Sequence, residues 1–294
     1  MGLLLICLAA IAWGTTGTTS VLIAQQVTVS PLIVGLWRIV FALPVFWLWY
    51  GYGRRTTVVS TDAFTLGNRL KLLAMGLCMA GYQVFYFAAV PYAGVAMTAM
   101  VAICSSPMII ALLAVIFLKE KLHRNRMIAL ALGVTGTILL IAQPDALQVQ
   151  GSQFLLGVTL ALGAAVSYAG YAIMAKSLVG RMDAIAIATY SFTVAALVLT
   201  PTLVQQPALT VWFRALPFLL YLGIITSGIA YGIYMLGIRH TSATAAGIAV
   251  LLEPLTASLL GIFAFKEPIA WSSTLGALLL IAGILYAQKS DAKE

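Results

Sequence analysis

Residues 103–120 read ICSSPMIIALLAVIFLKE, and residues 250–267 read VLLEPLTASLLGIFAFKE. When the two stretches are laid over each other, Pro107 coincides with Pro254, and the closing Lys-Glu pairs coincide as well. Almost every other position is apolar, and each copy is close to the ~20 residues that a helix needs to cross a bilayer. A repeat of this size in an apolar chain is typical of transporters built from two related halves. Only the second copy carries an acid, Glu253, directly before its proline.

The composition excludes a soluble globular protein. Of the 294 residues, 62% are hydrophobic and 8% are charged, and the mean hydropathy is +1.05. Soluble domains carry roughly 25% charged residues. Helices are favoured over a β-barrel because the runs are apolar throughout, whereas barrel strands alternate over ~10 residues. We therefore expect an all-α polytopic membrane protein whose surface contacts the lipid bilayer.

Ten spans account for the sequence. We expect ten transmembrane helices arranged as two inverted five-helix repeats around a central cavity, with residues 1–147 forming the first repeat and residues 148–294 the second. The expected spans are 2–24, 30–52, 70–91, 94–118, 127–143, 153–179, 184–203, 214–237, 243–265 and 270–288.

Lys and Arg are distributed unevenly between the two sides that these spans define. With a cytoplasmic N-terminus, the inner loops and the C-terminal tail hold 13 basic residues and the outer loops hold two. This is the distribution expected from the positive-inside rule, so both termini are predicted to be cytoplasmic. Because five is an odd number of spans, the second repeat must be inverted relative to the first. The net charge of +8 reflects this topology, and we expect no nucleic-acid partner.

Tyrosines recur at helical spacing in three of the expected spans. The pairs are Tyr82 and Tyr86, Tyr168 and Tyr171, and Tyr231 and Tyr234. Each pair can occupy one face of its helix, and all six lie too far from the span ends to be interfacial anchors. One interpretation is a cavity lining that binds substrate, with Gln83 as a polar member beside the first pair. The alternative is helix packing, with each hydroxyl bonded to a neighbour.

Polar and ionisable residues occur inside three spans. Trp13 and Thr15 could bind a solute, although packing through small residues explains them nearly as well. Arg38 and Glu253 must each face a cavity, a partner or water, because a charge in hydrocarbon costs ~2.5–3.5 kcal/mol on insertion scales. Glu253 either carries a proton or binds an ammonium group of the solute, or it accepts hydrogen bonds from free N–H groups and holds its helix. Arg38 either meets a substrate carboxylate or holds a neighbouring helix.

Four features together indicate a family. They are the ten-span plan, Trp13-Gly14 in the first span, Arg38 in the second, and the pattern LLEPLTASLLGIFAFKEP at residues 251–268. With them the chain resembles the drug/metabolite transporter superfamily in its EamA-type branch, although it has no charged residue in the first span, unlike many members. The resemblance implies a cavity walled by spans one to four and six to nine, with spans five and ten outside. Within the branch the chain looks closest to bacterial exporters of aromatic and other amino acids.

The resemblance and the residues lead to one functional prediction and its alternatives. We expect a bacterial inner-membrane transporter that exports small amphipathic metabolites, such as amino acids including aromatic ones, by alternating access. A multidrug or cationic-compound exporter that uses Glu253 is the alternative. An intramembrane enzyme or an assembly subunit has less support, because no H-E-x-x-H, P-loop or dinucleotide motif occurs. We expect no enzymatic activity, cofactor or metal, and the oligomeric state stays open, with a monomer compatible with the sequence.

Overall fold

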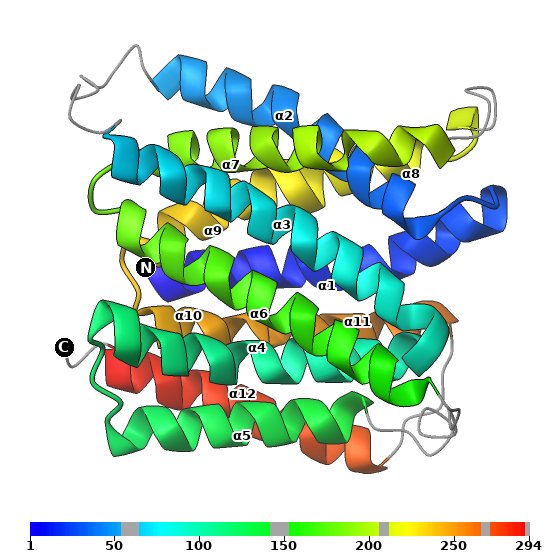
Figure 1. Ribbon diagram of the computed structural model, residues 1–294. Helices are drawn as coiled ribbons and strands as arrows, with labels where there is room; N and C mark the ends of the chain where they lie inside the picture. The colour runs from blue at the N-terminus through cyan, green and yellow to red at the C-terminus, as the bar shows by residue number, and fades with distance from the viewer. Residues whose placement is uncertain (54–64, 142–152, 206–211, 266–270, 292–294) are drawn as a thin grey trace.

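The computed structural model describes residues 1–53, 65–141, 153–205, 212–265 and 271–291, and within these ranges every regular element is a helix (Figure 1). The elements are α1 (Gly2–Gln26), α2 (Pro31–Gly53), α3 (Leu66–Ala93), α4 (Val95–Leu118), α5 (Arg124–Ile141), α6 (Phe154–Leu178), α7 (Ala184–Leu199), η3 (Thr200–Gln205), α8 (Leu216–Tyr221), η5 (Leu222–Ile229), α9 (Ala230–Ile238), α10 (Ala243–Val250), α11 (Leu252–Phe265) and α12 (Trp271–Asp291). Among them are ten helical segments long and apolar enough to cross a membrane, and the predicted boundaries differ from theirs by at most four residues. The prediction of an all-α polytopic membrane protein is confirmed.

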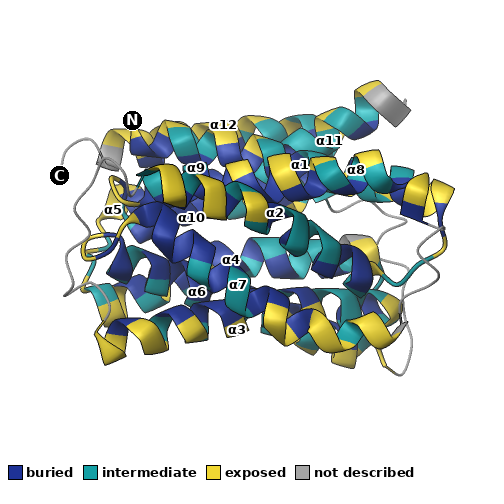
Figure 2. Cartoon of the chain, turned by 90° about the horizontal axis from the view of Figure 1, so that it is seen from above, coloured by how far each residue is buried: buried dark blue, intermediate teal, exposed yellow. Residues whose placement is uncertain are grey.

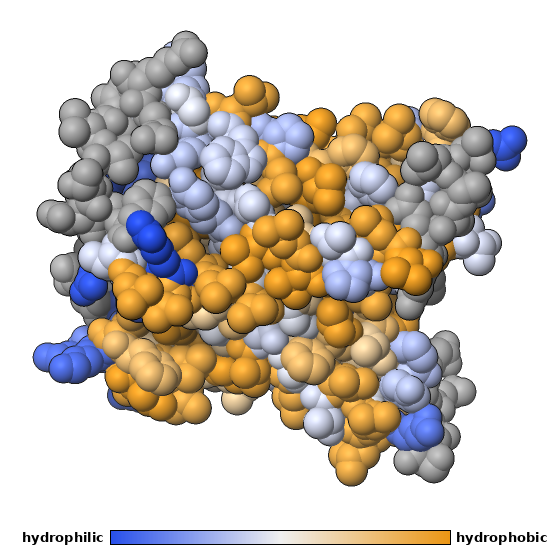
Figure 3. Space-filling view, turned by 45° about the horizontal axis from the view of Figure 1, so that its top comes forward, coloured by the Kyte–Doolittle hydropathy of each residue, from blue (hydrophilic) through white to orange (hydrophobic). Residues whose placement is uncertain are grey.

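The outer surface of the bundle is apolar between its two ends. Leu48, Leu155 and Phe263 are each at least 75% exposed, and Figure 3 shows apolar side chains over the middle of the visible face, with hydrophilic ones gathered at the ends. A helix satisfies its own backbone hydrogen bonds, so it can face lipid with apolar side chains only. The buried residues lie on the inward faces of the central helices (Figure 2).

The N-terminus and the end of α12 at Asp291 lie at one end of the bundle, which we call the terminal end (Figure 1). α1 begins at this end and α6 finishes there, so the first helices of the two expected repeats run in opposite directions. α3 packs along α6, and α9 with η5 packs along α1. These contacts join span three to span six and span eight to span one. Each becomes the other when the two five-span repeats are exchanged. α5 and α12 pack on each other at one edge of the bundle.

Glycines bring α5 and α12 into direct backbone contact. A Cβ added at Gly136 would lie 2.6 Å from the carbonyl oxygen of Gly276 and 2.6 Å from the backbone nitrogen of Leu280. A Cβ added at Gly283 would lie 2.8 Å from the backbone nitrogen of Gly133. These distances leave no room for side chains, as in other interfaces of membrane helices that are formed by small residues. α5 and α12 thus form a tightly packed pair at the edge of the bundle.

The ninth span is interrupted, which its apolar pattern does not predict. The break falls at Leu251, between α10 and α11. Pro254 causes it, because proline has no N–H for the carbonyl of Val250 and its ring collides with that carbonyl. α4, in contrast, continues through the equivalent Pro107. There the hydroxyl of Ser106, directly before the proline, donates to the carbonyl of Ala102 at 2.6 Å.

The eighth span contains a π-helical segment, η5, between α8 and α9. Two of its glycines pack on α2, where Gly223 meets Phe41 and Gly228 meets Val45. Residues five apart in an α-helix point about 140° away from each other, whereas the wider π turn, with its i→i+5 hydrogen bonds, brings them closer to one face. The π segment thus places Gly223 and Gly228 on the same side of the span, where both pack on α2.

Candidate functional site

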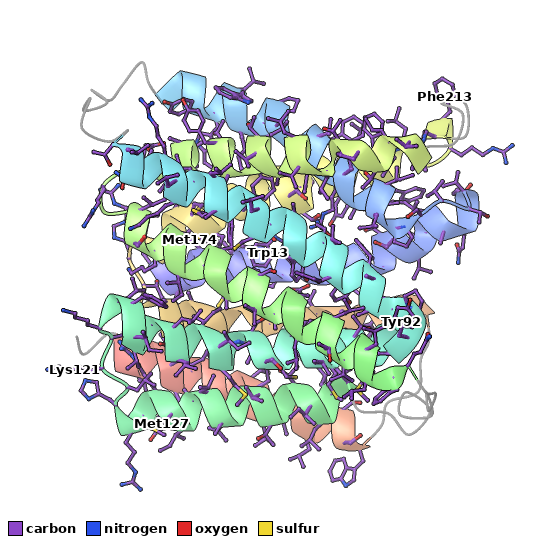
Figure 4. All side chains as sticks on the ribbon, in the orientation of Figure 1. Trp13, Tyr92, Lys121, Met127, Met174 and Phe213 are labelled. Atoms are coloured by element: carbon purple, nitrogen blue, oxygen red, sulfur yellow. The ribbon has the colours of Figure 1, made fainter. Side chains whose placement is uncertain are left out.

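Four of the predicted aromatic residues form a group near the centre of the bundle. Figure 4 shows Trp13 there, midway along α1. Its ring centroid lies 4.6 Å from that of Tyr231 and 5.4 Å from that of Tyr234, both on α9. The ring of Tyr171 on α6 lies 6.1 Å from that of Tyr231. These separations lie in the range of favourable aromatic pairs.

The three other predicted tyrosines form an adjoining group. The ring of Tyr82 on α3 lies 5.8 Å from that of Tyr86 and 5.9 Å from that of Tyr168 on α6. Tyr168 also neighbours Tyr234, although their hydroxyls lack the geometry of a hydrogen bond. This contact joins the two groups, so the structure brings all seven aromatic residues together. We call these seven residues and Phe192 the aromatic cluster.

Phe192 is the member of the cluster that the sequence analysis missed. Its ring on α7 lies 4.9 Å from that of Tyr231 and 4.9 Å from that of Phe46 on α2. Phe192 stands in an ordinary apolar run, and the nearby Tyr190 contacts the rings of another group on α2. No spacing signal in the sequence distinguishes Phe192 from a lipid-facing phenylalanine.

Three polar atoms of the cluster are buried without a hydrogen bond to any described residue. They are the indole N–H of Trp13 and the hydroxyls of Tyr168 and Tyr171. Ser191 is a neighbour of the Tyr171 hydroxyl, but the two hydroxyls do not meet hydrogen-bond geometry, and the serine donates its proton to the carbonyl of Ala188 at 3.2 Å. Because buried polar groups nearly always have partners, the cluster offers hydrogen-bonding capacity that the protein itself does not use.

Glu253 lies in the first turn of α11, where this helix contacts α1. A Cβ added at Gly14 would lie 2.6 Å from the carbonyl oxygen of Glu253, so the two backbones touch. The glutamate side chain is half-buried and has no hydrogen bond or ion pair with another described residue. It is within electrostatic range of Tyr82, Tyr86 and Tyr168. The hydrogen bonds required by the helix-holding interpretation are therefore absent from the described part of the chain.

Arg38 borders the same cluster from α2. Its Nε donates to the hydroxyl oxygen of Ser227 in η5 at 3.1 Å. The guanidinium is within electrostatic range of Tyr82, Tyr231 and Glu253, yet no ion pair joins it to Glu253 in the described residues. The cluster thus has one charge of each sign at its border, and neither charge is neutralised by a direct ion pair with a described residue.

Two predicted site residues point elsewhere. Thr15 donates to the carbonyl of Ala12 at 2.7 Å and shares a hydrogen bond of 3.0 Å with the hydroxyl of Tyr221 on α8. Gln83 is buried, with its amide 3.5 Å from a Cβ added at Gly35 of α2. The helical period explains both positions, because residues one or two apart do not share a face.

An apolar cavity of about 240 Å³ lies between α2 and α7, away from the aromatic cluster. Trp37, Val40 and Leu197 are among its lining residues, and Leu197 is 68% exposed. The cavity therefore adjoins the lipid-facing surface. In the part of the chain that the structure describes, no three His, Cys, Asp or Glu side chains are grouped so that they could hold a metal ion.

Comparison with known proteins places this architecture in a family. The model of the EamA-like transporter family matches residues 1–142 and residues 155–287. The uncharacterized transporter YwfM of Bacillus subtilis (strain 168) is 32% identical over 296 residues, which cover 99% of this chain and 95% of the relative. An uncharacterized transporter of Clostridium kluyveri is 25% identical over 202 residues, which cover 67% of this chain and 65% of that protein. A crystal structure with 19% sequence identity has the same fold, with a TM-score of 0.79 and coverage of 99% of this chain and 98% of that chain. The chain therefore belongs to the EamA-like transporter family of the drug/metabolite transporter superfamily.

Proposed function

We propose that this transporter exports small amphipathic metabolites, chiefly amino acids including aromatic ones, by alternating access across a bacterial inner membrane. The substrate class is supported by one arrangement, the aromatic cluster with its unpartnered polar atoms and its two bordering charges. The acid Glu253 and the base Arg38 are within electrostatic range of each other and of Tyr82 and Tyr231. A zwitterion with an apolar ring matches this distribution of charge and aromatic surface.

Each part of such a substrate has a counterpart at the cluster. An ammonium group would be attracted to the carboxylate of Glu253 and to the faces of nearby tyrosine rings. A carboxylate would accept hydrogen bonds from the terminal nitrogens of Arg38, whose Nε is already bonded to Ser227. The hydroxyls of Tyr168 and Tyr171, which have no protein partner, would bond polar atoms of the solute or water between them.

The transport cycle we propose uses the two halves of the chain as inverted repeats, with both termini in the cytoplasm. Three observations support it: the opposite directions of α1 and α6, the exchange-related packing of α3 on α6 and of α9 on α1, and the family match to each half. Inverted repeats open a central site to alternate sides by rocking against each other. The driving force is an ion gradient or the gradient of the solute itself.

Counterflow in proteoliposomes tests the substrate class with three matched solutes. Liposomes loaded with phenylalanine, phenethylamine or phenylpropionate are given the same labelled compound outside. Wild-type protein should exchange phenylalanine fastest. Arg38→Gln should slow phenylalanine and phenylpropionate by about tenfold or more, because a hydrogen bond to a charged group contributes ~1.5–3 kcal/mol, and should leave phenethylamine unchanged. Glu253→Gln should slow phenylalanine and phenethylamine instead. Equal losses for all three solutes, or no exchange of any, would refute the assignment.

A cationic-compound exporter is the second candidate, favoured by the unpartnered Glu253 beside the tyrosines. In that case phenethylamine would exchange faster than phenylalanine, and Arg38→Gln would have no effect on either. The role of Glu253 as a proton carrier is tested in the same vesicles with and without a pH gradient. If Glu253→Gln keeps full transport and responds to the pH gradient as wild type does, Glu253 is not the proton carrier.

A further inference from the structure

Glu120 connects the two halves of the chain at the terminal end. Its Oε1 accepts a hydrogen bond from the backbone N–H of Ala243 at 2.6 Å. Its Oε2 accepts one from the backbone N–H of Thr244 at 3.3 Å and one from the Thr244 hydroxyl at 2.8 Å. Glu120 follows α4 in the first half, and the two partners begin α10 in the second. Both oxygens of the carboxylate are therefore engaged by one helix N-terminus of the other half.

The backbone at the end of α4 aims Glu120 at α10. The backbone of Lys119 has the left-handed conformation, with φ 56° and ψ 31°. It is the one non-glycine residue with positive φ in the described ranges. The N–H of Glu120 donates to the carbonyl of Ala114 at 3.1 Å, and the same carbonyl accepts the N–H of Lys119. Lysine is strained in this conformation, where glycine would not be, and such strain persists where surrounding contacts hold it.

The Glu120 contact is more than a helix cap, because α10 already has a cap from Ser242, the residue directly before it. The hydroxyl oxygen of Ser242 accepts a hydrogen bond from the N–H of Ala245 at 3.2 Å. What Glu120 adds is a negative charge at the positive end of the α10 dipole, and a bond between two elements that belong to different halves. Bonds of this charge-assisted kind are roughly twice as strong as neutral ones.

α10 also leads directly to the aromatic cluster. It ends at Val250, and Glu253 follows in the first turn of α11. Along its length α10 packs on α4, where a Cβ added at Gly247 would lie 3.4 Å from Pro107 and 3.3 Å from Ile110. A separation of α4 from α10 at the terminal end would therefore open a route that reaches the level of Glu253.

We propose that the contact between Glu120 and the N-terminus of α10 is the latch that closes the transporter at the terminal end. The latch is closed in this structure, and the central site reaches that side of the membrane only after Glu120 leaves α10 and water takes over its hydrogen bonds. The inference rests on alternating access, as proposed above. The second Lys-Glu pair, at residues 266–267, lies outside the described residues and has no part in it.

Spin-label distances between the two halves test the latch without any substrate. In protein whose three native cysteines are replaced by serine, one label is placed at Lys121, which is exposed at the terminal end (Figure 4). The other is placed in the second half at the exposed Arg239, which follows α9 and whose carbonyl lies beside Lys176 in the last turn of α6. Glu120→Gln should add a longer-distance population and raise the ratio of long to short distances by about tenfold, because the carboxylate loses its charge-assisted bonds. Thr244→Ala, which removes one partner from the other side, should shift the ratio in the same direction by less.

Asp183→Asn is the matched control. Asp183 also places a carboxylate oxygen on a helix N-terminus at the terminal end, 2.9 Å from the N–H of Ala186, but both residues belong to the second half. The distances should not change in this variant. An unchanged distribution in Glu120→Gln and Thr244→Ala, or an equal shift in the control, overturns the latch. The distance measurement needs no solute. A failed counterflow panel would therefore refute the proposed substrate, while the latch would still be tested by the distances alone.

Discussion

Replacing Gly14 by alanine tests whether the contact between α1 and α11 positions Glu253 at the cluster. The added Cβ would lie 2.6 Å from the carbonyl oxygen of Glu253 and 2.5 Å from Cβ of Thr256. Ordinary contacts begin at 3.4 Å, so α11 must move by about 0.8 Å relative to α1. Trp13 is adjacent to Gly14 on α1, and the shift therefore changes the position of Glu253 relative to the aromatic cluster.

The size of the effect follows from two opposing terms. Overpacking of this kind costs ~1–3 kcal/mol, while replacing a glycine inside a helix by alanine gains ~0.5–1 kcal/mol. We expect Gly14→Ala to lower the free energy of unfolding by about 1–2 kcal/mol. Because binding groups must be held within ~0.5 Å, we also expect the exchange rate to fall by about fivefold or more.

Gly17→Ala is the control for this prediction. A Cβ at Gly17, one turn further along α1, has no heavy atom within 4 Å, so this variant should keep wild-type exchange and unfold at the same or a slightly higher temperature. The assays are thermal unfolding of the purified protein and counterflow measured well below the unfolding temperature. If Gly14→Ala matched Gly17→Ala in both assays, the close contact between α1 and α11 would play no part in positioning the site.

Three further predictions address the site and its frame. Tyr171→Phe removes a buried hydroxyl without a protein partner, so the unfolding temperature should stay the same or rise while counterflow slows by about threefold or more, the effect of losing one hydrogen bond of ~0.5–1.5 kcal/mol. Ser227→Ala removes the acceptor 3.1 Å from Arg38 Nε and should raise the apparent KM for phenylalanine by about fivefold, with phenethylamine unaffected and Ser227→Thr restoring part of the loss. Gly136→Ala forces α5 from α12 and should cost ~1–3 kcal/mol of stability, yet exchange below the unfolding temperature should persist because the α5–α12 pair stands apart from the aromatic cluster.

The positions of the spans could be predicted from the sequence because they depend on local properties. A run of apolar residues long enough to cross a bilayer must form a helix there, since lipid offers no partner for the backbone. The same locality placed the tyrosine pairs, because residues three or four apart share a helix face whatever the helix packs against. The packing of α1, α3, α6 and α9 then brings the six tyrosines and Trp13 together in the cluster.

Other features depended on contacts between distant segments. Thr15 and Gln83 point to α8 and α2, and Phe192 enters the cluster, although nothing in their local sequence marks the face each one occupies. In a soluble helix polarity would show which side is buried, but here lipid and protein interior are both apolar, so the inward face leaves little trace in the sequence.

The repeat at residues 103–120 and 250–267 also has one part that the sequence determines and one that only the tertiary structure decides. Its two prolines and two Lys-Glu pairs are visible in the sequence and indicate two related halves. Only the tertiary structure shows that one proline interrupts its span while the other does not, and that Glu120 bonds a helix that begins 123 residues later. Repetition is a property of the chain itself, whereas a bond across the halves forms only where folding brings a carboxylate and the free N–H groups of a helix end together.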